Sequence, residues 1–168
     1  MGEGWENARR RDDGNDFVTF ALAAPGTIGV AELDTRYFVG NAPGWASLSG
    51  IDARTGSPDD PAAWVELLPR TRLQPDTPHR FRLAADRVVT HVRMDVHPDG
   101  GLARVRLHGT VPATERDLLG LRWFNALPET HARAVVEPFG AEAAAKLVAA
   151  RPFADPAELP EALRAAFE

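Results

Sequence analysis

Apolar and polar residues alternate in short runs along the chain as far as Pro112. Glycine, proline, asparagine and aspartate separate these runs about every ten residues, in segments such as GNAPG and HPDGG. Short alternating runs between turn-forming residues are typical of antiparallel strands in a β-sandwich or jelly roll. The runs predicted as strands are 17–22, 28–35, 45–51, 63–68, 79–84, 88–96 and 102–111.

The run 88–96 shows the alternation most clearly. Side chains of neighbouring residues in a strand point to opposite faces of the sheet. We therefore expect Val88, Thr90, Val92, Met94 and Val96 to point one way, and Val89, His91, Arg93 and Asp95 to point the other. The run that begins at Leu102 behaves alike, with Arg104, Arg106 and His108 opposite Ala103, Val105 and Leu107. One face is predicted to be core, and the other polar and rich in arginine and histidine.

After Pro112 the apolar spacing becomes helical, so we divide the chain into a domain of residues 1–111 and a helical extension of residues 112–168. Thr114 is the predicted cap of a first helix, which ends at Pro128. A second helix is predicted over 129–138 and a third over 141–150, with Gly140 between them as a stop. Asp155, followed by proline and by Glu158 three residues later, predicts the cap of a last helix that carries Leu159, Leu163 and Phe167.

Composition and charge narrow the class of protein. The 168 residues include no cysteine, which excludes disulfides, thiolate zinc sites and cysteine nucleophiles and fits a reducing compartment. The net charge of −5 argues against a dedicated nucleic-acid binder. No apolar run is long enough to span a membrane, and the polar start is unlike a secretory signal. We therefore expect a soluble, cytoplasmic protein without nucleic-acid or membrane partners.

Five motifs, in order, resemble the allantoicases. They are GWENARRRDDGNDF, ELDTRYFVGN, WASLSG, LLPRTRLQPDTPHRF and THVRMDVHPDGGLARVRLHG, which together span residues 3–111. Allantoicases contain two copies of a jelly-roll module with a galactose-binding-like fold, and this chain resembles one copy, most nearly the second. It departs from the family's pattern at Glu3, Asn7, Phe17 and Val39, where the family has Asp, Thr, Trp and Lys. Residues 121–167 resemble the opening helices of ureidoimidazoline decarboxylases, without that family's catalytic His-Pro motif.

The resemblance implies a hydrolase that converts allantoate and water to ureidoglycolate and urea in purine degradation. Allantoate carries one carboxylate and two ureido groups, so a site needs arginine for the carboxylate, acceptors for ureido N–H groups and a group that moves a proton. We expect Glu6 and His91 to be catalytic, and Arg10, Asn41, Arg70 and Arg104 to bind substrate. Glu6 would also accept a ureido proton, and Arg10 belongs to the triplet of arginines 9–11.

Each of these residues also has a structural interpretation. The N-terminal charges are typical of a solvated segment, Asn41 of a turn, and His91 of a hydrogen-bonded structural histidine. Arg70 at a strand end often only ties loops together. Arg104 and Arg106 either clamp a carboxylate or pair with Asp95 and Glu32, and Asp34 is expected to pair with an internal arginine. A tight turn by itself explains the segment 97–101.

No cofactor is predicted, because dinucleotide and P-loop signatures are absent, and no metal-ligand spacing appears, although a divalent metal is left open. Small ureides are the expected ligands. Because a single module stands where the family has two, we expect at least a homodimer. Two alternatives to the enzyme remain, a non-catalytic ureide-binding module and an assembly subunit of a purine-catabolic enzyme.

Overall fold

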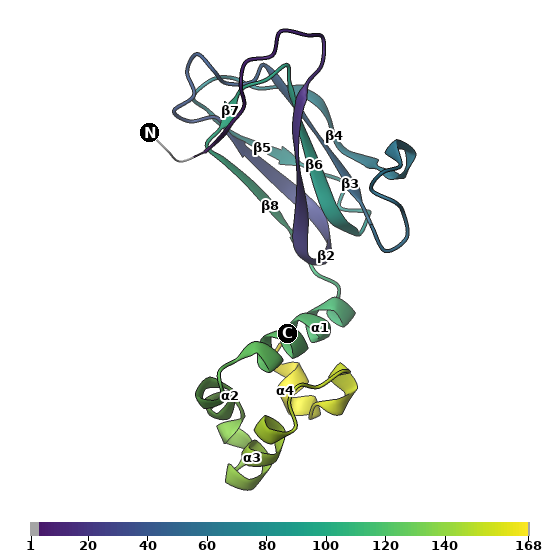
Figure 1. Cartoon of the computed structure of the whole chain (residues 1–168), viewed down its shortest axis with the longest axis vertical. Coiled ribbons are helices and arrows are strands. Elements are labelled where there is room, and N and C mark those ends of the chain that lie inside the picture. Colours follow the sequence, from purple (N-terminus) through teal and green to yellow (C-terminus); the bar gives the residue numbers. More distant parts are fainter. Residues whose placement is uncertain (1–3, 168) are drawn as a thin grey trace. The chain divides into compact units, whose positions relative to one another are not determined.

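A computed structural model describes residues 4–167 and divides the chain into two compact units, Met1–Thr110 and Val111–Glu168. The division falls one residue before the predicted boundary. The first unit consists of strands and the second of helices, as Figure 1 shows. The predicted class, an antiparallel β-sandwich followed by a small helical region, is confirmed.

The strands of the first unit form two sheets, each of which takes one arm of the element β2. The strands are β1 (Trp5–Glu6), β2 (Asp16–Asp34), β3 (Trp45–Ile51), β4 (Val65–Arg72), β5 (Pro78–Arg82), β6 (Val89–His97), β7 (Gly101–Leu102) and β8 (Arg104–Thr110). The first sheet has the order β4-β3-β6-β2, and the second places β2 between β5 and β8. Strands β1 and β7 form a separate short ribbon. Every pairing is antiparallel.

The predicted strands over 17–22 and 28–35 form the two arms of the single element β2. The hydrogen-bonded element is continuous, but it reverses direction around Pro25 and Gly26: Asp16 pairs with Val96 and Asp34 with Arg104, so both ends of β2 lie at the same end of the sandwich (Figure 1). Its first part pairs with β6, and its second part pairs with β5 and β8 (Figure 1). Proline and glycine thus lie where the chain turns back, as their spacing predicts, and the turn takes the chain from the first sheet into the second.

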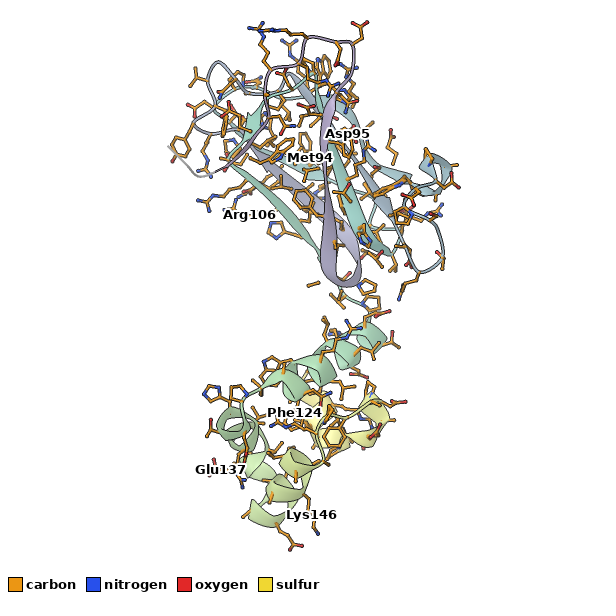
Figure 2. The ribbon with its side chains drawn as sticks, viewed as in Figure 1. Met94, Asp95, Arg106, Phe124, Glu137 and Lys146 are labelled. Carbon is orange, nitrogen blue, oxygen red and sulfur yellow. The ribbon has the colours of Figure 1, made fainter. Side chains whose placement is uncertain are left out.

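The apolar core lies between the two sheets. Val92, Met94 and Val96 of β6 are fully buried, whereas Asp95 lies on the opposite face; Met94 and Asp95 are labelled in Figure 2. The prediction for Val89 was wrong: it is 1% exposed and belongs to the core. The alternation shifts phase between Val89 and Val92, where β6 runs beside the irregularity of β2. His91, Arg93 and Asp95 keep the outward direction that their spacing predicts.

The helical unit has a core of its own. Its helices are α1 (Ala113–Ala126), α2 (Glu129–Val136), α3 (Ala141–Ala149) and α4 (Glu161–Ala165), with 3₁₀ turns at Glu137–Phe139 and Pro156–Glu158. The core consists of Leu121, Phe124, Ala132, Val136, Ala144, Val148, Leu159 and Leu163. None of the helices formed between residues 4 and 167 is long and apolar enough to cross a membrane.

The helix ends confirm one predicted cap and correct another. Asp155 and Glu158 form the predicted capping box. It lies at the start of a 3₁₀ turn rather than of a long helix, because Pro160 separates this turn from α4. Thr114 is not a cap, since α1 begins at Ala113 and follows Pro112. Proline's fixed φ suits the entry to a helix without a side-chain cap.

Candidate functional site

Loops from distant parts of the sequence meet at one end of the sandwich. The N-terminal segment 4–15, the loop 35–44 and the turn 97–101 contribute to it. The backbone N–H of Gly101 donates to the Asn41 carbonyl at 2.8 Å, and the N–H of Arg10 donates to Asp99 Oδ2 at 2.5 Å. The turn 97–101 therefore holds both other segments. Asp99, whose predicted role was only in a tight turn, is the acceptor that anchors the N-terminal segment.

Glu6 and Asn41 are brought into direct contact. Asn41 Nδ2 donates to Glu6 Oε1 at 2.5 Å, and both side chains are exposed. Glu6 lies opposite Gly101 in the β1–β7 ribbon. Gly100 has φ +128, and a Cβ there would lie 2.6 Å from Pro43 N, so only glycine lets the Asn41 loop approach so closely. The remaining carboxylate oxygen and the Asn41 amide oxygen are acceptors for N–H groups of a ligand.

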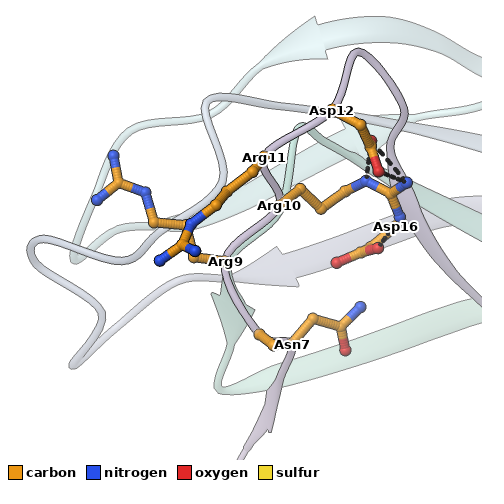
Figure 3. A pocket seen from close by; sticks show the side chains of 7 residues that line it. Asn7, Arg9, Arg10, Arg11, Asp12 and Asp16 are labelled. Atoms are coloured by element: carbon orange, nitrogen blue, oxygen red, sulfur yellow. Dashed lines mark hydrogen bonds and ion pairs between the residues drawn. The ribbon is translucent and has the colours of Figure 1, made fainter.

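Arg10 is already held by two carboxylates. Its Nη1 lies 2.6 Å from Asp16 Oδ1 and its Nε lies 2.9 Å from Asp12 Oδ1, as the dashed lines in Figure 3 show. Hydrogen bonds from Arg10, and then from Asn7, hold the pKa of Asp16 below its ordinary value. Arg10 therefore serves the shape of the N-terminal loop, and its positive charge is matched by its neighbours.

Arg9 and Arg11 are the cations that this loop leaves open. They line the same depression of about 480 Å³ as Arg10, and Figure 3 shows both extending away from the Arg10–Asp12–Asp16 cluster. Within the part of the chain that the structure describes, neither forms an ion pair. The sequence singled out the triplet correctly as a group, but only contacts show which arginines remain available to an anion.

Arg70 lies over Trp45 on the outer face of the first sheet. Its guanidinium carbon is 5.6 Å from the centre of the Trp45 ring, and Trp45 faces His97 in the β3–β6 register. Burial first, and then the charge of Arg70, lower the pKa of His97. The imidazole of His97 is thus held in its neutral form further toward acid than an ordinary histidine.

His91 is not brought to Glu6 and Asn41 within one chain. It stands six residues before His97 on β6, which at about 3.3 Å per residue separates them by roughly 20 Å. Its Nδ1 lies 2.9 Å from Thr90 Oγ1, and its side chain is on the outer face of the sheet.

The second sheet carries the predicted arginines of β8. Arg104 is exposed at the first position of β8 and lines a hollow of about 280 Å³ together with Trp5. The predicted pairing of Arg106 with Glu32 is confirmed, and Arg80 Nε also donates to Glu32, at 2.8 Å. Asp34, 1% exposed, pairs with Arg36 at 2.5 Å, as its expected role in an ion pair requires. Within residues 4–167, no group of three or more histidine, aspartate or glutamate side chains is placed to hold a metal ion.

Residues 1–112 match the family model described as the allantoicase repeat. This chain belongs to the allantoicase repeat family. The sandwich is 61% identical over 110 residues to a probable allantoicase of Nocardia farcinica, an alignment that covers 65% of this chain and 31% of that protein. It is similar to the crystal structure of allantoicase from Saccharomyces cerevisiae, with 30% identity and a TM-score of 0.56 over 64% of this chain and 31% of that one.

The allantoicase repeat therefore makes up the first unit, and the chain spans about a third of the length of the relatives it matches. A carbohydrate-binding module of a Clostridium perfringens glycoside hydrolase, 10% identical, shares the fold with a TM-score of 0.51 over 64% of this chain and 75% of that one. The galactose-binding-like fold is thereby confirmed. The family model ends at residue 112, so the resemblance of the helical unit to ureidoimidazoline decarboxylases stays a prediction.

Proposed function

We propose that the chain is an allantoicase-type hydrolase of purine degradation that acts on allantoate in the cytoplasm. The observation that carries the proposal is the allantoicase repeat itself, together with the Glu6–Asn41 pair at its loop end. In the reaction, the carbon that bears both ureido groups gains a hydroxyl from water and loses one C–N bond. The departing nitrogen takes a proton, so urea and ureidoglycolate leave.

The side chains at the loop end suit the parts of this substrate. Glu6 and Asn41 present acceptors side by side for ureido N–H groups, while cationic Arg70, and Arg9 and Arg11 in the N-terminal depression, suit the carboxylate. In this proposal Arg10 and Arg104 support the pocket from its flanks, and His91 moves the proton. Because His91 lies far from Glu6 within one chain, the proposal requires a second chain.

We further propose that the protein is at least a dimer of identical chains, with a ureide as its small-molecule ligand. The relatives are about three times as long as the aligned repeat, whereas this chain offers one repeat. A symmetric pair is the simplest way to supply two copies.

Urea release from allantoate by the purified chain tests the function. We expect turnover, a drop of at least about 10²-fold in kcat for Glu6→Gln, and a KM raised by about one to two decades for Arg70→Ala. Glu142→Gln, on the surface of α3, is the matched control and should change neither. The assay is run with and without added divalent cations.

Two other results would replace the proposal. Allantoate binding in calorimetry without urea release, with or without divalent cations, would make the chain a ureide-binding module. Neither binding nor turnover, but stable association with a complete allantoicase, would make it an assembly subunit.

A further inference from the structure

The outer face of the first sheet carries an unusual set of exposed side chains. Phe17 is 52% exposed and Trp45 39% exposed, and each lies beneath an arginine. The guanidinium carbon of Arg93 is 3.8 Å from the centre of the Phe17 ring. Aromatic side chains and arginine are the residues enriched where proteins bind one another. We call this face, made by the outward residues of β2, β3 and β6, the aromatic–arginine face.

The strand register arranges this face in rows. Phe17, Asp95 and Ser47 form one row across β2, β6 and β3, and Thr19, Arg93 and Ser49 form the next. Within one chain, Arg93 Nη2 donates to Asp95 Oδ1 at 2.8 Å. The small side chains of Thr19, Ser47 and Ser49 beside this pair leave the middle of the face open to close approach. The row beyond Asp95 contains His97 and Trp45, and the row beyond Arg93 contains His91.

The outward charges of β6 are complementary to those of a second β6 that runs in the opposite direction. Its outward residues read His91, Arg93, Asp95, His97 from one end to the other. If a second copy packs on this face with its β6 antiparallel, about a two-fold axis at Met94, Arg93 of each copy faces Asp95 of the other. A parallel arrangement would place Arg93 over Arg93 and Asp95 over Asp95, which like-charge repulsion disfavours. The opposite charges therefore select the antiparallel packing, which is an isologous two-fold contact.

We infer that the aromatic–arginine face is the contact between two copies of this chain, and that it places His91 of each copy at the loop end of the other. In the antiparallel packing, the His91 row of one copy lies over the row of His97 and Trp45 of its partner. That row adjoins the turn 97–101, which holds the Asn41 loop. The roughly 20 Å between His91 and His97 along β6 is thus bridged by a second chain across facing sheets about 10 Å apart.

The inference rests on the proposed function for the role of His91, but not for the contact itself. A charge exchange tests the contact. In a pair of identical copies, Arg93→Glu places a carboxylate opposite Asp95, and Asp95→Arg places two arginines opposite each other, so each variant alone should be monomeric. Their equimolar mixture restores opposite charges at both positions and should return to the wild-type mass in sedimentation velocity. Arg122→Glu, on the surface of α1, is the control and should keep that mass.

Phe17→Glu provides a second disruption that leaves the Arg93–Asp95 pair intact, and circular dichroism of each variant confirms that it is folded. A monomeric wild type, or folded variants that keep the wild-type mass, would overturn the inference. So would a mixture that stays monomeric.

Activity complementation tests the shared site. His91→Ala and Glu6→Gln should each be inactive alone, whereas an exchanged equimolar mixture should recover about a quarter of wild-type urea release, because half of randomly assorted pairs are mixed and each contains one intact site. A mixture that forms dimers but stays inactive would overturn the sharing of His91. If the wild type is dimeric through this face but releases no urea, the proposed function fails while the contact stands.

Discussion

The two units of this chain differ in how far apart in the sequence their contacting residues lie. In the helical unit the side-chain contacts are often local: Glu142 pairs with Lys146 four residues later, and Asp155 accepts from the N–H of Ala157. In the sandwich the contacts join segments far apart in the chain. Glu32 accepts hydrogen bonds from Arg80 and Arg106, and Asn15 donates a hydrogen bond to Asp95. Local sequence patterns therefore describe the helical unit directly, whereas in the sandwich the register decides which residues meet.

The largest expected effect is the unfolding of the helical unit by a substitution in its core. Phe124 is fully buried in the cluster of the helical unit, so Phe124→Ala should cost about 3–5 kcal/mol, a large share of what so small a core supplies. Because the sandwich has a core of its own, far-ultraviolet circular dichroism should lose its helical signal while the sheet signal remains. Leu118→Ala, at a surface position of α1, is the control; simultaneous loss of both signals in Phe124→Ala would contradict the expectation.

A smaller effect concerns a carboxylate that the sandwich buries. Asp34 accepts hydrogen bonds from the backbone and the guanidinium of Arg36, and Asp34→Asn should cost about 1.5–3 kcal/mol at pH 7. The hydrogen bond from Arg36 holds the pKa of Asp34 below its unfolded value of 3.8. The ionised form therefore stabilises the fold fully above pH 3.8, and that stability is lost as the pH falls through the lower folded pKa.

Thermal melts at pH 7 and pH 3 measure how much Asp34 contributes to the loss of stability in acid. The difference between the two melting temperatures should be smaller in Asp34→Asn than in the wild type. It should not vanish, because the pKa values of Asp16, Asp52 and Glu32 are lowered as well and act in the same direction. An unchanged difference would show that Asp34 does not contribute to the acid sensitivity. Asp59→Asn, in an exposed loop, is the matched control.

The smallest expected effect concerns the two residues of the helical unit that the sequence predicted as caps. Asp155→Ala removes the capping box of the turn Pro156–Glu158 and should cost about 1 kcal/mol. Thr114→Ala should be neutral, because Thr114 lies inside α1 and caps nothing. Urea melts of the two variants separate these cases, and a loss for Thr114→Ala equal to that for Asp155→Ala would contradict the assignment of the caps.

Strand periodicity predicted much of the sandwich, including the outward direction of His91, Arg93 and Asp95. It failed at Val89, which pairs with Gly26 beside the register shift of β2 and lies in the core. A proline–glycine pair predicted the turn between the two arms of β2, but only the pairing partners show that these arms belong to different sheets. The same limit applied to the loop end, where the contact of Glu6 with Asn41 depends on how the turn 97–101 folds.

The sequence by itself determined the two-part organisation, the family and the residue types of the candidate site, because periodicity, caps and ordered motifs are properties of neighbouring residues. Only the tertiary structure decided which charges remain available. It neutralised Arg10 with Asp12 and Asp16, left Arg9 and Arg11 open, and set His91 about two nanometres from Glu6's end of the sandwich. The physical reason is that a charge or a hydrogen-bonding group acts over a few ångströms, and strand pairing brings distant residues within that range or keeps them apart.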